Sequence, residues 1–190
     1  MNLPNKLTIS RILLTFVYMF FLFNKGILSK HIALFIFLIA SLTDLYDGRI
    51  ARKRKLITNF GRIMDPIADK ILILASFLAF VELKIIPAWM VVIVILRELI
   101  ITGLRLFAAS RSIVLEAQKE GKHKTVSQFI AVILILVYLI LKDTLARFRI
   151  WNLHWERACS LIIFLIILIV IGLTLYSGIS FLWKNRRIIA

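Results

Sequence analysis

Four of the five aspartates in this 190-residue chain lie between positions 44 and 69, and the fifth, Asp143, stands alone. Asp44 and Asp47 are spaced i, i+3, and Asp65 and Asp69 are spaced i, i+4. On a helix, each of these spacings makes two side chains project from a single face. Two neighbouring helices joined by a short basic connection can pack antiparallel, so we expect all four carboxylates to come together.

A cluster of this kind needs compensation. Four neighbouring carboxylates repel one another, and each charge inside a membrane helix costs roughly 2.5–3.5 kcal/mol on insertion scales. Hard oxygen ligands without a nearby histidine or cysteine favour Mg²⁺ or Mn²⁺ over Zn²⁺. Four acids are enough to bridge two ions, which is the number we expect. The alternative is that the acids only pair with the neighbouring bases Arg49, Arg52, Lys53, Arg62 and Lys70.

Six apolar runs approach the roughly 20 residues that a membrane-spanning helix needs. They cover about 7–23, 31–44, 67–81, 87–107, 126–141 and 158–183, with breaks at 24–26, 84–87, 110–124 and 142–157. The second and third runs are long enough only if their helices continue into the polar stretch 43–70. We therefore predict an all-α, single-domain integral membrane protein over 1–190, with about six transmembrane helices and a polar site near the cytoplasmic membrane boundary.

Composition excludes several other classes of protein. With 61% hydrophobic residues and a mean hydropathy of +0.94, the chain has too much apolar surface for a soluble domain of its length. The same numbers exclude a disordered chain. A single cysteine, Cys159, excludes an internal disulfide and a CxxC metal site. Beside long apolar runs, the net charge of +15 indicates anionic lipid headgroups as partners and not nucleic acid.

The distribution of basic residues predicts the orientation. The larger share of the 25 lysines and arginines falls on the side of the N-terminus, so we expect both termini to be cytoplasmic in a multi-pass protein of the inner membrane. The segment 142–157 runs against this bias. Residues 1–5 carry no basic charge, and we expect no cleavable signal peptide. Gly172 and Gly178 form a loose small-residue pattern suited to helix packing or dimerisation, and we expect a homodimer.

The aspartates belong to a longer pattern. It reads Asp44-Leu-Tyr-Asp47-Gly48-Arg-Ile-Ala51-Arg52, then eight residues, then Gly61-Arg-Ile-Met-Asp65-Pro-Ile-Ala-Asp69. This resembles the signature of the CDP-alcohol phosphatidyltransferases, D-x2-D-G-x2-A-R-x8-G-x3-D-x3-D, at every specified position. The length of the chain and its six apolar runs are also similar to that family, so the resemblance covers essentially all of the sequence.

The resemblance implies a metal-dependent reaction, in which an acceptor hydroxyl attacks the β-phosphorus of CDP-diacylglycerol and releases CMP. It implies that the metals are held by Asp44, Asp47, Asp65 and Asp69, with Asp69 also the general base. It further implies a CDP-lipid site that contains Asn5, Thr8, Gly48, Ala51, Arg52, Thr58 and Gly61. For Thr8 the alternative is a simple helix cap.

Two later stretches, 97–105 and 121–128, resemble the bacterial phosphatidylglycerophosphate synthases, one group within this family. That resemblance implies sn-glycerol 3-phosphate as acceptor, bound by Arg105, Lys122, Lys124, Thr125 and Gln128. His123 departs from the group's pattern, which has an apolar or small residue there. The alternative for each base is contact with lipid headgroups. For Glu98 we expect a structural ion pair with Arg97.

Other functions remain open at this stage. The nearest use the same chemistry with another acceptor, as in a cardiolipin synthase or a phosphatidylinositol-phosphate synthase. Intramembrane prenyltransferases also place aspartates around Mg²⁺, but they are longer and carry two separate motifs. A cation transporter with an acidic site is the most distant alternative, and it would tolerate the loss of Arg52 or Gly48.

Overall fold

The computed structural model describes residues 3–54, 59–111 and 120–186, and within these ranges the chain forms six α-helices and no strand. Side chains are described for 9–43, 67–68, 70–111 and 124–186. The helices are α1 (Leu3–Phe23), α2 (Ile27–Arg54), α3 (Asn59–Glu82), α4 (Ala88–Ser110), α5 (Glu120–Arg147) and α6 (Leu153–Lys184). The prediction of an all-α fold is confirmed.

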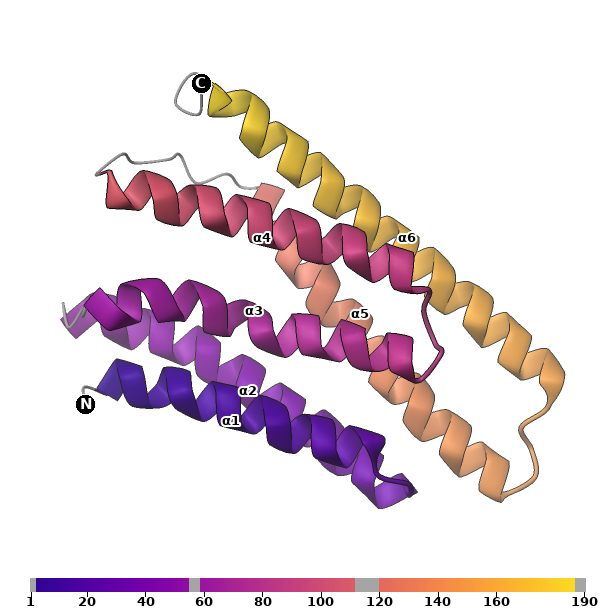
Figure 1. Cartoon of the computed structure of the whole chain (residues 1–190). Coiled ribbons are helices and arrows are strands. Elements are labelled where there is room, and N and C mark those ends of the chain that lie inside the picture. Colours follow the sequence, from indigo (N-terminus) through magenta and orange to yellow (C-terminus); the bar gives the residue numbers. More distant parts are fainter. Residues whose placement is uncertain (1–2, 55–58, 112–119, 187–190) are drawn as a thin grey trace.

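Two helices extend beyond their apolar runs. α2 continues to Arg54 and α3 begins at Asn59, so both reach into the polar stretch 43–70, as the shortness of their apolar parts required. The backbone at the four clustered aspartates is therefore helical, with one pair on each helix. α2 and α3 run in opposite directions and contact each other, and α1 packs against both (Figure 1).

The predicted break at 142–157 is mostly helical, which corrects the sequence-based boundary. α5 continues to Arg147 and α6 begins at Leu153. The charged residues that suggested a loop face each other across the two helices, because Lys142 Nζ lies 2.5 Å from Glu156 Oε1. The predicted break at 110–124 also ends too late in the sequence, because α5 already begins at Glu120.

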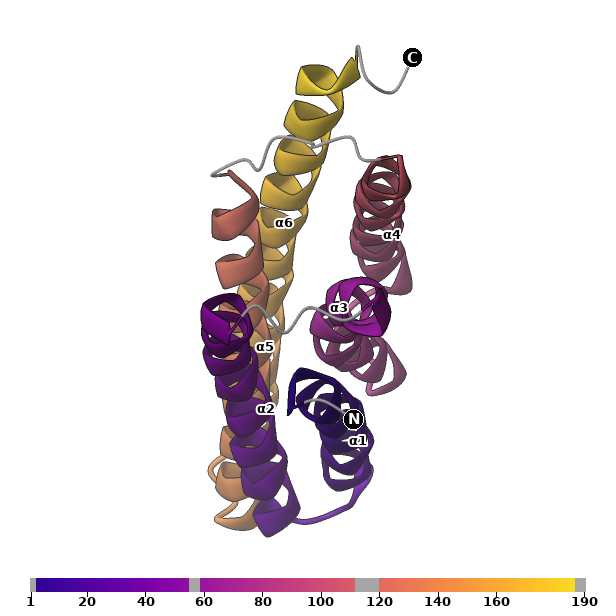
Figure 2. The ribbon, with the colours of Figure 1, turned by 90° about the vertical axis from the view of Figure 1, so that its left-hand side faces the viewer.

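Successive helices run up and down the bundle, so their ends gather in two groups (Figure 1). The aspartate end contains the first residues of α1, α3 and α5 and the last residues of α2, α4 and α6. The far end contains the opposite ends of the same helices. α5 packs against α2 and α6, and α4 packs against α3 and α6; Figure 2 shows α4 and α5 on opposite sides of the bundle.

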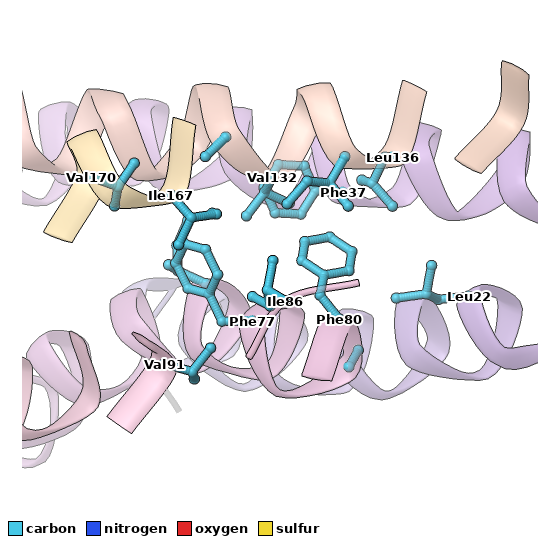
Figure 3. Close-up of a cluster of buried hydrophobic side chains, with 14 of the residues drawn as sticks. Leu22, Phe37, Phe77, Phe80, Ile86, Val91, Val132, Leu136, Ile167 and Val170 are labelled. Carbon is cyan, nitrogen blue, oxygen red and sulfur yellow. The ribbon is translucent and has the colours of Figure 1, made fainter. Parts of the chain in front are cut away.

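The core lies between the helices and is built from large apolar side chains (Figure 3). Phe77 and Phe80 of α3 are almost completely buried and lie among residues of α5 and α6. The ring of Phe37 in α2 lies 5.7 Å from that of Tyr18 and 5.9 Å from that of Phe129. These contacts join α1, α2 and α5 near the middle of the bundle.

The outer surface of the bundle is also apolar. Many large hydrophobic side chains are exposed on the outward faces, among them Phe16, Phe20, Phe35 and Ile169, each more than 60% exposed. Within the described residues, Lys124–Arg147 and Leu153–Lys184 are long and apolar enough to cross a membrane, and Ile9–Phe23 and Ile27–Thr43 are shorter apolar helical segments. A surface of this kind is costly in water and favourable in a lipid bilayer.

The connections at the far end contain three residues with positive φ. Gly26, between α1 and α2, has φ 134°, which glycine adopts readily because it lacks a Cβ. Lys84 follows α3 with φ 56°, and Arg149 follows α5 with φ 58°. Residues with a Cβ are disfavoured in this left-handed region.

Candidate functional site

A buried carboxylate links three helices near the middle of the bundle. Glu98 is the only acid in α4, and the residue is 2% exposed. Its Oε2 accepts a hydrogen bond from Lys70 Nζ of α3 at 2.7 Å, and its Oε1 accepts one from Lys124 Nζ of α5. An acid in an apolar helix needs partners of this kind, because an unpaired charge in a low-dielectric interior is strongly unfavourable.

Two further side chains complete this Glu98 cluster. Arg97 Nη1 lies 3.3 Å from Glu98 Oε1, and its Nη2 donates to Ser177 Oγ of α6 at 2.9 Å. Gln128 Nε2 of α5 lies 3.4 Å from the same Glu98 oxygen. The cluster therefore connects α3, α4, α5 and α6. The expected pairing of Arg97 with Glu98 is present, but Lys70 and Lys124 are the closer partners.

The cluster carries a surplus of positive charge. Among the described side chains it contains three cations, Lys70, Arg97 and Lys124, and one carboxylate, Glu98, so the formal sum is 3 − 1 = +2. Each lysine has three N–H donors, and a single carboxylate cannot use all of them. An anion bound beside the cluster would take the remaining donors and neutralise the surplus charge.

A small cavity lies against this cluster. Its volume is about 130 Å³, and its lining consists of Lys70, Ile73, Leu74, Glu98, Lys124, Thr125, Gln128 and Phe129. Lys124 and Gln128 are 4% and 3% exposed, so their polar ends are held within the bundle. Three of the five residues predicted to bind the acceptor, Lys124, Thr125 and Gln128, thus come together around one cavity.

The cavity lies beside the helix that carries the second aspartate pair. Asp69 immediately precedes Lys70 and stands one helical turn before Ile73, and both of these neighbours line the cavity. Asp65 stands one turn earlier on the same helix. The spacing predicted from the sequence is therefore realised along α3, with the cavity beyond the last aspartate.

Several predicted site residues fall outside what the structure describes. For these the backbone is helical but the side chains are not described: Asn5, Thr8, Asp44, Asp47, Gly48, Ala51, Arg52, Gly61, Asp65, Asp69 and Lys122. Thr58 lies outside the described residues altogether. Their assignments to the CDP-lipid, the metals and the acceptor stay predictions.

The donor set at 44–69 fits a hard divalent cation. It consists of four carboxylates, placed in pairs at one-turn spacing on α2 and α3. Carboxylate oxygens are the ligands that Mg²⁺ and Mn²⁺ prefer. Among the side chains that the structure does describe, no group of three or more His, Cys, Asp or Glu residues is close enough to hold a metal. The aspartate pairs, whose side chains lie outside this description, stay the predicted metal ligands.

Arg105 lies apart from the cavity. Its guanidinium carbon is 5.1 Å from the centroid of the Phe181 ring on α6, an arrangement typical of a cation–π contact. Arg105 does not line the cavity formed by Lys124, Thr125 and Gln128. The structure thus brings together three of the predicted acceptor residues and places Arg105 against a neighbouring helix.

Sequence reasoning missed two residues of the cavity. The sequence predicts Lys70 only as a partner for the aspartates, and Glu98 only as a partner for Arg97. A signal was present for each: Lys70 directly follows the last aspartate of the motif, and Glu98 is a lone acid in an apolar helix. Such an acid is expected to find several donors from neighbouring helices.

Comparison with known proteins finds a family and several relatives for this chain. A family model described as CDP-alcohol phosphatidyltransferase matches residues 1–184. A CDP-diacylglycerol–glycerol-3-phosphate 3-phosphatidyltransferase of Bacillus subtilis is 42% identical over 72% of this chain and 77% of its own length. A protein of the same name from Rickettsia felis is 34% identical over 72% and 75%. A probable phosphatidylglycerophosphate synthase of Mycobacterium tuberculosis is 38% identical over 73% and 67%.

Proposed function

This chain belongs to the CDP-alcohol phosphatidyltransferase family, and we propose that it transfers a phosphatidyl group from CDP-diacylglycerol to sn-glycerol 3-phosphate. The products are phosphatidylglycerophosphate and CMP. In the transfer, the acceptor hydroxyl oxygen forms a bond to the β-phosphorus, and the bridging oxygen of the pyrophosphate leaves with CMP. The hydroxyl proton is taken up by a base, for which we propose the Asp69 carboxylate.

The four aspartates supply the electrostatic part of this chemistry. We propose that Asp44, Asp47, Asp65 and Asp69 hold Mg²⁺ or Mn²⁺, with two ions bound. When bound, divalent cations neutralise the charge of a pyrophosphate and make its phosphorus a better electrophile. The protein's own contribution is to fix the acids on two antiparallel helices and to leave one of them within reach of the acceptor hydroxyl.

The CDP-lipid would lie beside the first half of this motif. Small residues at Gly48, Ala51 and Gly61 leave room for the nucleotide, and the Arg52 guanidinium pairs with phosphate oxygens. Asn5, Thr8 and Thr58 contribute hydrogen bonds to the nucleotide. These roles rest on the match between the motif and the family signature.

The acceptor site rests on one observation in particular: the cavity lined by Lys124, Thr125 and Gln128 adjoins a cluster with two surplus positive charges. A phosphate monoester carries close to two negative charges at neutral pH. An acceptor with a phosphate group would neutralise the cluster, whereas glycerol or another uncharged alcohol would not. We propose that Lys70 and Lys124 bind this phosphate and that Thr125 and Gln128 contact the hydroxyls, with Lys122 and Arg105 on the path of entry.

The protein is a membrane protein with apolar helices. We propose that all six helices span the inner membrane, that the aspartate end and both termini face the cytoplasm, and that the protein forms a homodimer. The even number of helices in the described residues supports the placement of both termini on one side. The many exposed apolar side chains support the spanning of a bilayer.

The reaction can be tested with purified protein in detergent. CDP-diacylglycerol and Mg²⁺ or Mn²⁺ are supplied with sn-glycerol 3-phosphate, glycerol, myo-inositol 1-phosphate or phosphatidylglycerol, and CMP is measured. We expect CMP release with sn-glycerol 3-phosphate to exceed that with every other acceptor. Background release with sn-glycerol 3-phosphate, together with release for phosphatidylglycerol or the inositol phosphate, would show that the acceptor assignment is wrong while keeping the reaction class.

A substitution then tests the cavity itself. Lys124→Met should raise the KM for sn-glycerol 3-phosphate about tenfold or more, because a hydrogen bond to a charged group is lost. The KM for CDP-diacylglycerol should change much less. Arg111→Gln is a matched control, since it removes a positive charge from an exposed residue at the same end of the bundle that does not line the cavity. Equal effects of the two substitutions on the acceptor KM would refute the assignment of the cavity.

A further inference from the structure

A second and much larger cavity opens at the far end of the bundle. Its volume is about 770 Å³, within the range typical of ligand sites. It lies between the connection from α1 to α2, the connection from α3 to α4 and the ends of α5 and α6. The aspartates stand at the opposite ends of α2 and α3, so this cavity is separate from the proposed active site.

The lining of this far-end cavity is strongly basic. Five cations line it, against two acids, so the formal sum is 5 − 2 = +3. The cations are Lys25, Lys30, Lys84, Lys142 and Arg147, and the acids are Asp143 and Glu156. They come from four separate segments of the chain, and the fold brings them around one space.

The charges inside the cavity are only partly compensated. Lys142 pairs with Glu156 at 2.5 Å, and the Lys30 ammonium, in a residue 8% exposed, donates to the backbone carbonyl of Leu22. The side chains of Lys25, Lys84 and Arg147 have no hydrogen bond or ion pair with any described residue. Three cationic side chains are therefore available to a ligand.

Lys84 lies in a tight turn whose backbone is left-handed. Lys84 has φ 56°, in the left-handed region where a glycine would be more favourable. Its backbone N–H donates to the carbonyl of Val81 in the tight turn that ends α3. The turn thus presents a cation to the cavity, in a backbone conformation that glycine would adopt more readily.

The surroundings of this cavity have the composition expected at a membrane surface. Exposed aromatic side chains, Trp89, Phe148 and Trp155, lie at the ends of α4, α5 and α6 beside the cavity. Aromatic residues gather where lipid headgroups meet the acyl chains. The basic residues here also oppose the general bias of charge toward the aspartate end, which a specific ligand would explain.

We propose that the far-end cavity binds the phosphate of an anionic phospholipid headgroup, with Lys25, Lys84 and Arg147 as its cationic contacts. Asn24, Tyr138 and Ser160 also line the cavity and offer neutral hydrogen-bonding groups for the rest of a polar headgroup. The acyl chains would lie along the apolar outer faces of the neighbouring helices. This site does not depend on the reaction at the other end of the bundle.

Two substitutions separate this site from a general effect of charge. Lys84→Gly removes a cavity cation and relieves the left-handed backbone. Arg149→Gly also removes a positive charge and relieves a left-handed backbone, with φ 58°, at the same end of the bundle. Arg149 does not line the cavity, so this variant is the control. Because both changes relieve strain, neither is expected to unfold the protein, and melting in phosphatidylcholine micelles verifies this.

The measurement is the affinity of the full-length protein for fluorescent phosphatidylglycerol, with phosphatidylcholine as the zwitterionic comparison. We expect wild type and Arg149→Gly to prefer phosphatidylglycerol, and Lys84→Gly to bind it about fivefold more weakly, the effect of one basic contact at a membrane surface. Lipid bound at the active site contributes equally in all three proteins. Equal affinities of Lys84→Gly and Arg149→Gly, or no preference for the anionic lipid, would overturn the proposal.

Competition identifies the source of the phosphate. Glycerophosphoglycerol and inorganic phosphate are added to wild type with the labelled lipid bound. If millimolar soluble phosphate displaces the labelled lipid from wild type, and does so less effectively from Lys84→Gly, the phosphate site is open to soluble anions. Displacement only by vesicles containing phosphatidylglycerol would support a site that requires the whole lipid.

Discussion

Removal of the Glu98 charge is the most informative single perturbation of the fold. Glu98→Gln keeps the size of the side chain but leaves Lys70 and Lys124 without the carboxylate that both now contact. The Glu98 side chain is 3% exposed and that of Lys124 is 5% exposed. Removing one partner from a buried ion pair typically costs about 3–5 kcal/mol, because the other charge stays buried without compensation.

The chain offers a matched comparison. Lys142 and Glu156 also form a close ion pair, at 2.5 Å, but their side chains are 36% and 42% exposed. A solvent-exposed pair contributes roughly 0.2–1 kcal/mol. Glu98→Gln should therefore lower the free energy of unfolding by at least about 2 kcal/mol more than Glu156→Gln does. The chemical change is the same in both variants, so the difference reports burial.

Reversible unfolding in mixed detergent micelles, followed by circular dichroism, measures both free energies. A double variant, Glu98→Gln with Lys124→Met, tests the cause, because removing the uncompensated ammonium should recover part of the lost stability. The reasoning is refuted if Glu98→Gln and Glu156→Gln destabilise the protein equally. It is also refuted if the double variant is less stable than the sum of its two single changes predicts.

Three further predictions concern the aspartates and the packing of α6. Asp69→Asn should lower CMP release by 10²–10⁴-fold, the usual contribution of a general base, whereas Glu82→Gln, an exposed acid at the other end of α3, should not; unchanged turnover in Asp69→Asn would reject the base assignment. Chelation of divalent cations should abolish CMP release, and Mn²⁺ or Mg²⁺ but not Ca²⁺ should restore it fully; activity that survives chelation would contradict the metal proposal. Gly178→Ala should lower the melting temperature relative to Gly172→Ala, because a Cβ at 178 would lie 3.1 Å from Arg97 Cγ while one at 172 meets nothing within 4 Å; equal melting temperatures would show that Arg97 can move aside.

The sequence predicted the helices well because their signal is local. Each apolar run is long enough to identify its helix, and the need for length in the second and third runs correctly extended α2 and α3 into the polar stretch. The break at 142–157 was predicted wrongly, because charged residues such as Lys142 and Glu156 suggest a solvent-exposed loop when only the sequence is considered. Their pairing across two helices is visible only once those helices are placed side by side.

The sequence predicts the aspartate motif, but it does not predict the contacts of the Glu98 cluster. The spacing of the aspartates indicates metal chemistry without any knowledge of the fold, and the motif names the family. The contacts of Lys70 and Lys124 with Glu98 join residues 28 and 26 positions apart, and no periodicity within one helix encodes them. The charge surplus at the cavity follows from those contacts, so it became visible only in three dimensions.

Successive helices run in opposite directions, so the two cavities lie toward opposite ends of the bundle. This separation has a practical consequence for work on sealed vesicles. With a rise of about 1.5 Å per residue, the 13 residues from Asp69 to Glu82 place these two positions about 20 Å apart along α3. On the proposed topology, a membrane-impermeant reagent added outside meets only one of the two cavities in a population of uniform orientation. Inside-out and right-side-out vesicles allow each cavity to be blocked, labelled or supplied with ligand while the other stays untouched.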